Sequence, residues 1–136
     1  MIPDNWLKRL DTVMSFDSGW LNGLEGVPVD PQVKNIVEGI LAEFYNENIL
    51  NGQRPGIYPL ISGGIQLEWE ENQVDYSIEI ENSGFVELSA FGREVDLENS
   101  LKIETSNRDD LNRIIKLLNT MRVEVLNKNF AQSPTT

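Results

Sequence analysis

The fold of this chain is decided by residues 65–91, which read IQLEWEENQVDYSIEIENSGFVELSAF. Apolar and polar residues alternate through most of this stretch, and a period of two is typical of a β-strand with one buried face. Turn-forming residues interrupt the alternation at 71–73 and at Asn82-Ser83-Gly84. Short turns between consecutive alternating strands predict an antiparallel meander. We expect its strands at about 65–70, 74–81 and 85–91.

Shorter segments on both sides of this stretch extend the prediction. Ile57-Tyr58-Pro59-Leu60 is extended, but the proline cannot donate a hydrogen bond, so we expect at most an edge strand there. Ser100–Thr105 also alternates and is a candidate fourth strand of the meander. Ser62-Gly63-Gly64 leads into a strand and not into a helix, which favours a tight turn with positive φ over a phosphate-binding loop.

Apolar residues at helical spacing predict three helices. The first covers about 4–15. The second covers about 31–48 and begins at Asp30-Pro31, an N-cap residue followed by the proline that suits a first helical turn. The third covers about 107–127, after Ser106 and Asp109, which resemble a capping box. The order α-α-β-β-β-(β)-α, with one apolar face on each element, predicts a two-layer α+β fold.

Length and composition predict a single domain. The chain has 136 residues, 40% of them apolar, which suits one compact core. No repeat or linker is visible, so we expect one domain over 1–130 and a frayed polar tail over 131–136. The sequence has neither an apolar run of membrane-spanning length nor a signal-peptide pattern.

The composition also argues against several kinds of chemistry. The sequence has no cysteine and no histidine, which removes disulfides, thiolate nucleophiles, zinc–thiolate centres and the commonest general base. Ser18 and Ser62 therefore have no histidine to activate them. No segment matches the calcium-binding loop with its alternating aspartates. We expect no catalytic residues, no metal site, no cofactor and no enzymatic activity.

Charge is distributed unevenly along the chain. The sequence has 11 basic and 22 acidic residues, a net charge of −11. Residues 55–92 contain no Lys or Arg, but they contain seven acids: Glu68, Glu70, Glu71, Asp75, Glu79, Glu81 and Glu87. A surface of this sign repels nucleic-acid phosphate and anionic lipid and attracts basic proteins or cations. We therefore expect no direct nucleic-acid partner and no membrane partner.

Side-chain alternation predicts where these charges lie. The apolar set of the strands would face the second and third helices, and the other face would be open. That open face would display Gln66, Ser77 and Ser89 together with Glu68, Glu70, Asp75, Glu79, Glu81 and Glu87.

Three interpretations of the open face are left. The face docks a basic protein partner, or it is an ordinary solvated face compensated by charges from elsewhere, such as the helix over 107–127. The third interpretation is a pair of catalytic carboxylates, which fits an open sheet less well than a cleft. A homo-oligomer in which a second copy of the chain covers this face is a further alternative.

Aromatic residues offer a different class of function. Trp20, Tyr58 and Pro59 would form a slot for a small ligand, in an aromatic region that also includes Trp69. Packing of these rings in the core or at its rim is the alternative explanation.

Two motifs carry a family resemblance. They are the loop Phe16-Asp17-Ser18-Gly19-Trp20-Leu21-Asn22-Gly23 and, after the helix that Pro31 begins, the segment Tyr58-Pro59-x-x-x-Gly63-Gly64-Ile65-x-Leu67-Glu68-Trp69. This pattern resembles small uncharacterised bacterial proteins, although Leu21 departs from it. The resemblance implies a bacterial, cytoplasmic protein of accessory or mobile-element origin and assigns no activity. From the acidic open face we expect a non-enzymatic binding protein that engages a basic protein partner, as an antitoxin-, immunity- or inhibitor-like protein would.

Overall fold

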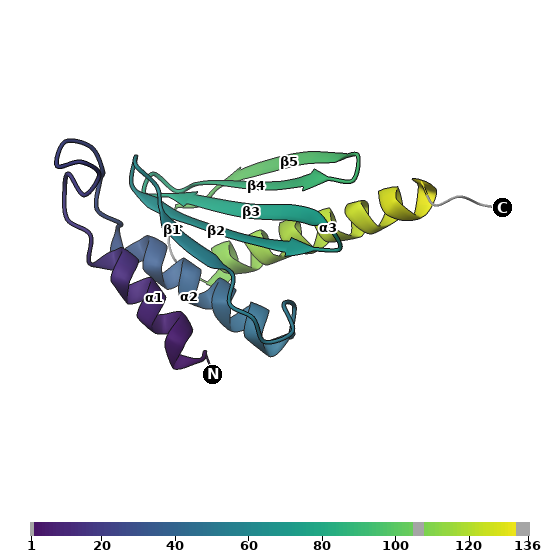
Figure 1. The fold of residues 1–136 in the computed structure, drawn as a ribbon, viewed down its shortest axis with the longest axis horizontal. Helices are drawn as coiled ribbons and strands as arrows, with labels where there is room; N and C mark the ends of the chain where they lie inside the picture. The colour runs from purple at the N-terminus through teal and green to yellow at the C-terminus, as the bar shows by residue number, and fades with distance from the viewer. Residues whose placement is uncertain (1, 105–107, 133–136) are drawn as a thin grey trace.

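The computed structural model describes residues 2–104 and 108–132 and confirms the α+β architecture. Three helices and one five-stranded antiparallel sheet follow each other in the order α-α-β-β-β-β-β-α. The sheet forms one layer, and the helices lie against one of its faces (Figure 1). The strands neighbour each other in chain order, which makes the sheet a simple meander. Its strands are β1 (Gly56–Pro59), β2 (Gly64–Glu71), β3 (Val74–Glu81), β4 (Phe85–Gly92) and β5 (Val95–Lys102).

The last strand is where the sequence prediction was wrong. The three central strands and the edge strand at β1 are confirmed, but β5 begins at Val95 and not at Ser100. The β4–β5 turn is formed by Arg93 and Glu94, both with positive φ (49° and 64°). Such turns usually contain Asn or Gly, so these two residues give no turn signal in the sequence.

The helices are α1 (Asp4–Met14), α2 (Pro31–Asn46) and α3 (Arg108–Gln132). Pro31 takes the first helical position after Asp30, as predicted. Helix α3 runs five residues past its predicted end at 127 and includes the first two residues of the predicted tail. Ser106 of the capping pair and residues 133–136 of the tail lie outside the described residues. No helix within the described ranges is long and apolar enough to cross a membrane.

A single core lies between the helices and the sheet. Helix α1 contacts β1, α2 contacts β2, and α3 contacts β4 and β5. The predicted inward face of the sheet is confirmed, because all six of its residues are buried: Ile65, Leu67, Trp69, Tyr76, Ile78 and Ile80. They pack with buried residues of the helices such as Leu10, Ile40 and Leu118. The opposite face of the sheet is left without a covering helix (Figure 1).

Candidate functional site

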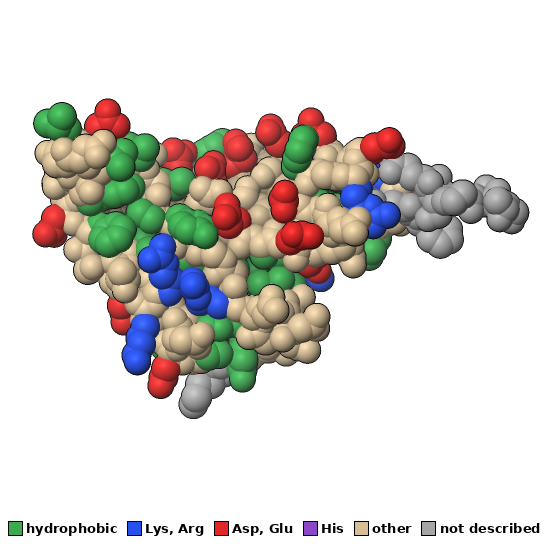
Figure 2. All heavy atoms as spheres, viewed as in Figure 1, with side chains coloured by type: hydrophobic (Ala, Val, Ile, Leu, Met, Phe, Trp, Pro, Cys, Tyr) green, Lys and Arg blue, Asp and Glu red, His purple; other side chains and the backbone are tan. Residues whose placement is uncertain are grey.

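The uncovered face of the sheet carries carboxylates on four adjacent strands. All six predicted acids lie there, since they alternate with the buried residues of β2, β3 and β4. Strand β5 adds two acids that the sequence analysis missed because it began this strand at Ser100. We call the eight residues the acidic face: Glu68, Glu70, Asp75, Glu79, Glu81, Glu87, Asp96 and Glu98. Figure 2 shows acidic side chains over the strands, with a group of basic side chains below them over the N-terminal helices.

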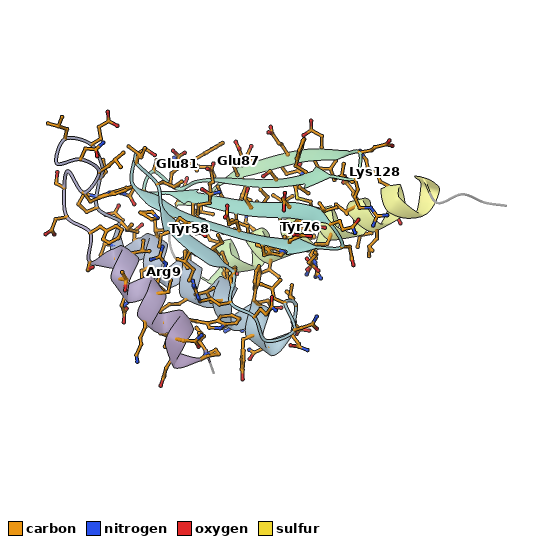
Figure 3. The ribbon with its side chains drawn as sticks, viewed as in Figure 1. Arg9, Tyr58, Tyr76, Glu81, Glu87 and Lys128 are labelled. Carbon is orange, nitrogen blue, oxygen red and sulfur yellow. The ribbon has the colours of Figure 1, made fainter. Side chains whose placement is uncertain are left out.

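Several of these carboxylates oppose each other across the strands. Glu79 on β3 lies directly opposite Glu87 on β4, and Glu70 on β2 lies opposite Asp75 on β3. Glu81 and Glu87 both extend from the side of the sheet away from α1 and α2 (Figure 3). Like charges in directly opposed positions destabilise a sheet. The acidic face therefore lowers the stability of the isolated protein.

Within the described ranges, no basic side chain forms an ion pair with a carboxylate of the acidic face. Among the described residues, ion pairs join Lys34 to Asp11 and Glu38, Arg113 to Asp110, and Arg122 to Glu71. Glu71 lies on the helix side, where its carboxylate receives two hydrogen bonds from Arg122 of α3. In the part of the chain that the structure describes, α3 therefore neutralises the charge of Glu71 but forms no ion pair with a residue of the acidic face. Lys102, at the rim of the open face, donates to the carbonyl oxygen of Ser83.

Glu79 lies at the centre of this repulsion. Partial burial raises the pKa of Glu79 above its ordinary value of 4.5, and the neighbouring charges of Glu87 and Glu81 raise it further. A raised pKa means that the folded protein binds a proton at Glu79 more readily than the unfolded chain does. The stability that the folded protein gains from protonation of Glu79 is present at low pH and is lost as the pH rises through the folded-state pKa of Glu79.

We expect Glu79→Gln to raise the free energy of unfolding at neutral pH by up to about 1 kcal/mol, because it removes one opposed charge. The wild type should also gain more stability than the variant when the pH falls from 7 to 5. Urea unfolding of both proteins at the two pH values measures this difference. Glu124→Gln on the exposed surface of α3 is the control. An equal pH dependence in wild type and Glu79→Gln would contradict the prediction.

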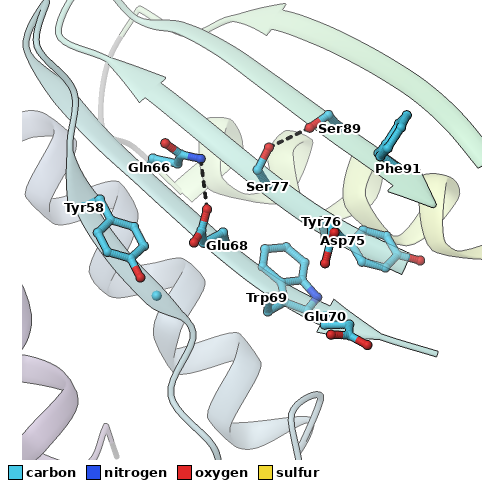
Figure 4. Close-up of a pocket in the computed structure, with 11 residues that line it drawn as sticks. Tyr58, Gln66, Glu68, Trp69, Glu70, Asp75, Tyr76, Ser77, Ser89 and Phe91 are labelled. Atoms are coloured by element: carbon cyan, nitrogen blue, oxygen red, sulfur yellow. Dashed lines mark hydrogen bonds between the residues drawn. The ribbon is translucent and has the colours of Figure 1, made fainter. Parts of the chain in front are cut away.

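The acidic face contains an open hollow of about 560 Å³ (Figure 4). Glu68, Glu70 and Asp75 supply its carboxylates. Ser77 and Ser89 lie opposite each other on its floor, with their hydroxyl oxygens 2.6 Å apart. Tyr58 and Phe91 flank it from β1 and β4, and their residues are 41% and 64% exposed. Carboxylates beside exposed aromatic rings suit a cationic group with an apolar stem, such as a Lys or Arg side chain.

The three aromatic residues of the predicted ligand slot lie on different surfaces. Trp20 packs against Phe16 in the loop and donates its Nε1–H to the carbonyl oxygen of Val27. Tyr58 lies on the open face, with the Arg9 guanidinium 5.7 Å from its ring centre. The Trp69 ring is buried on the helix side, stacked on Tyr76 with ring centres 5.4 Å apart. The structure therefore places Tyr58 and Trp69 in the lining of one hollow, with the Trp69 ring itself buried, and leaves Trp20 outside that lining.

Within the part of the chain that the structure describes, no group of three or more acidic side chains is placed to hold a metal ion. Comparison of the chain with protein-family models, curated proteins and solved structures found no match. The family resemblance therefore stays a prediction.

Proposed function

We propose that this protein is a non-enzymatic binding protein whose acidic face engages a basic protein partner, as a cytoplasmic antitoxin-, immunity- or inhibitor-like protein would. One observation carries the proposal: eight carboxylates share an open sheet face, and among the described residues none of them forms an ion pair. This arrangement costs stability in the isolated protein. Lys and Arg residues of a partner would relieve that repulsion on binding.

The residues that line the hollow indicate how a basic side chain of the partner would be bound. A guanidinium group from the partner would donate paired hydrogen bonds to a carboxylate such as Glu68 or Asp75, which lie on neighbouring strands. The exposed rings of Tyr58 and Phe91 would pack against the aliphatic stem or the cation of the same side chain. The remaining carboxylates would provide long-range attraction, which speeds association and is screened by salt.

Two charge-reversal variants test the proposal. Glu68→Lys/Glu79→Lys changes the acidic face, whereas Glu47→Lys/Glu124→Lys changes exposed acids at the end of α2 and on α3. Each pair adds four positive charges to the native −11, so both variants have a net charge of −7. The tagged proteins are used to capture partners from a nuclease-treated bacterial lysate at low and high salt, and affinity for the captured partner is then measured.

We expect the wild type and the helix variant to retain one stoichiometric basic protein at low salt and to release it at high salt. The acidic-face variant should bind this protein about tenfold more weakly or worse, since it places repulsive charges in the interface. Equal binding by the two variants would mean that net charge, and not this face, drives capture. Recovery of the bait alone would also contradict the proposal.

A further inference from the structure

The two edge strands of the sheet, β1 and β5, differ in how far their outer main-chain groups are satisfied. At the β1 edge, Pro59 has no N–H, and Arg9 Nε donates to the Ile57 carbonyl oxygen at 2.9 Å. Helix α1 also packs against this strand. The β5 edge is an eight-residue strand, and among the described residues its main-chain hydrogen bond beyond β4 comes from Arg113 Nη1 to the Lys102 carbonyl oxygen at 3.2 Å. Helix α3 packs against β5 in the same way, so the difference between the edges lies in their main-chain groups: within the described ranges, those of β1 are closed by Pro59 and Arg9, and those of β5 are largely left for another strand.

The hydrogen-bond ladder shows which groups of β5 point outward. Ile103 N–H donates to the Gly84 carbonyl oxygen at 2.8 Å, which orients the odd-numbered residues of this strand toward β4. In an antiparallel ladder the intervening residues point the other way. The N–H and C=O groups of Asp96, Glu98 and Ser100 are therefore directed toward the free edge. No other described residue forms a hydrogen bond with these groups, so they suit a ladder with an added strand.

The helix side of β5 is apolar but incompletely covered. Leu97 and Leu101 point toward the core and are only half-buried, whereas the inward residues of the inner strands, such as Ile78 and Leu88, are fully buried. A strand added at this edge would cover both leucines. The added strand that fits best would carry leucines beside Leu97 and Leu101 on the helix side. On the open face it would carry charges complementary to those of β5.

A second copy of β5 has these properties. We propose that two molecules pair through β5, antiparallel, about a two-fold axis at Asn99. This register places Asp96 opposite Lys102 of the second copy, and Leu97 opposite Leu101 of the second copy. The two-fold axis repeats each pair, as in any isologous interface. Two acid–base pairs and four clustered leucines result, with Glu98 opposite a serine.

Neighbouring registers are less favourable. A shift of two residues in one direction places Glu98 opposite itself across the axis, and opposed like charges destabilise strand pairing. A shift in the other direction pairs Glu98 with Lys102, but it places Leu101 opposite Asn99 and Leu97 opposite Ile103, which lies beyond the end of β5, so it loses the leucine pairs and part of the strand overlap. A shift by one residue would bring open-face residues opposite core-facing ones. The Asn99-centred register is the one that matches charge on one face and leucine on the other.

The test is sedimentation equilibrium of the purified full chain over a range of concentrations. We expect a species of twice the 15.4 kDa chain mass. Ser100→Pro removes an outward N–H without breaking a bond to β4, and it should weaken dimerisation about tenfold or more. Ser100→Ala keeps the N–H and is the matched control, so it should dimerise like the wild type. Circular dichroism of each variant establishes that the fold is intact.

A charge swap gives a second readout that does not depend on proline. Lys102→Asp should weaken dimerisation, and Asp96→Lys/Lys102→Asp should restore it by re-forming the pairs with exchanged signs. A chain that is monomeric at every concentration would overturn the proposal. So would a dimer insensitive to both Ser100→Pro and Lys102→Asp. The measurement uses the protein alone, so its outcome is independent of whether a basic partner exists.

Discussion

Replacing Gly64 by alanine is expected to lower the free energy of unfolding by about 3 kcal/mol. Gly64 begins β2 with φ at +132°, a backbone conformation that side chains disfavour. An alanine Cβ there would overlap the Ile80 carbonyl oxygen and lie 2.8 Å from the Glu81 Cα. Both atoms belong to the backbone of β3, which is held in register with Gly64, so neither can move without disturbing the β2–β3 pairing.

Urea unfolding of Gly64→Ala measures this loss, and Gly52→Ala is the matched control. Gly52 also has a positive φ, at +83°, but no other atom lies within 4 Å of the position of an added Cβ. The control should therefore lose only the conformational term, about 1 kcal/mol. Equal losses in the two variants would show that the close approach of β3 contributes nothing.

Replacing Arg122 by methionine is expected to cost about 2 kcal/mol of stability. The Arg122 guanidinium donates to both oxygens of Glu71, at 2.9 and 2.7 Å, and so joins α3 to β2. The Glu71 side chain is only 17% exposed, and its remaining partner would be Trp69 Nε1. Loss of the arginine leaves a poorly hydrated carboxylate, although the partial exposure of the pair keeps the cost below that of a fully buried one.

A double-mutant cycle with Glu71→Gln checks the origin of this loss by urea unfolding. The double variant Glu71→Gln/Arg122→Met should be more stable than the sum of the two single losses predicts, because no charge is then left without its partner. Strict additivity of the two losses would mean that the ion pair does not couple α3 to the sheet.

The same cluster also affects Tyr76, whose ring stacks on Trp69. Burial, reinforced by the charge of Glu71, raises the pKa of Tyr76 to about 12, while Arg122 opposes the increase. The phenol is therefore neutral throughout the pH range of these unfolding experiments, and its ionisation does not contribute to the Arg122→Met result.

The meander was predictable because each central strand alternates and ends in recognisable turn residues. Strand β5 was placed too late for two physical reasons. Asn99 occupies a core-facing position and interrupts the apolar alternation, which an edge strand tolerates because that position is half-buried. The preceding turn uses Arg93 and Glu94 in a conformation that neither residue favours.

The same error explains the incomplete prediction of the acidic face. Asp96 and Glu98 were missed because β5 was begun beyond them, whereas the other six acids followed directly from alternation in β2, β3 and β4. The place of Tyr58 depends on register: Tyr58 pairs with Gln66, so its ring lies on the open face beside the hollow that Trp69 also lines. Sequence spacing does not contain that pairing, and it does not show that Trp20 stays in a separate loop.

The order of the elements along the chain has a consequence for synthesis on the ribosome. Helix α2 is made before the strands and can cover β2 as soon as the first hairpin forms. Helix α3 follows all five strands, yet it supplies the cover of β4 and β5. The inward residues of that half of the sheet, Val86 and Leu88 among them, therefore stay accessible to chaperones until α3 has emerged from the exit tunnel.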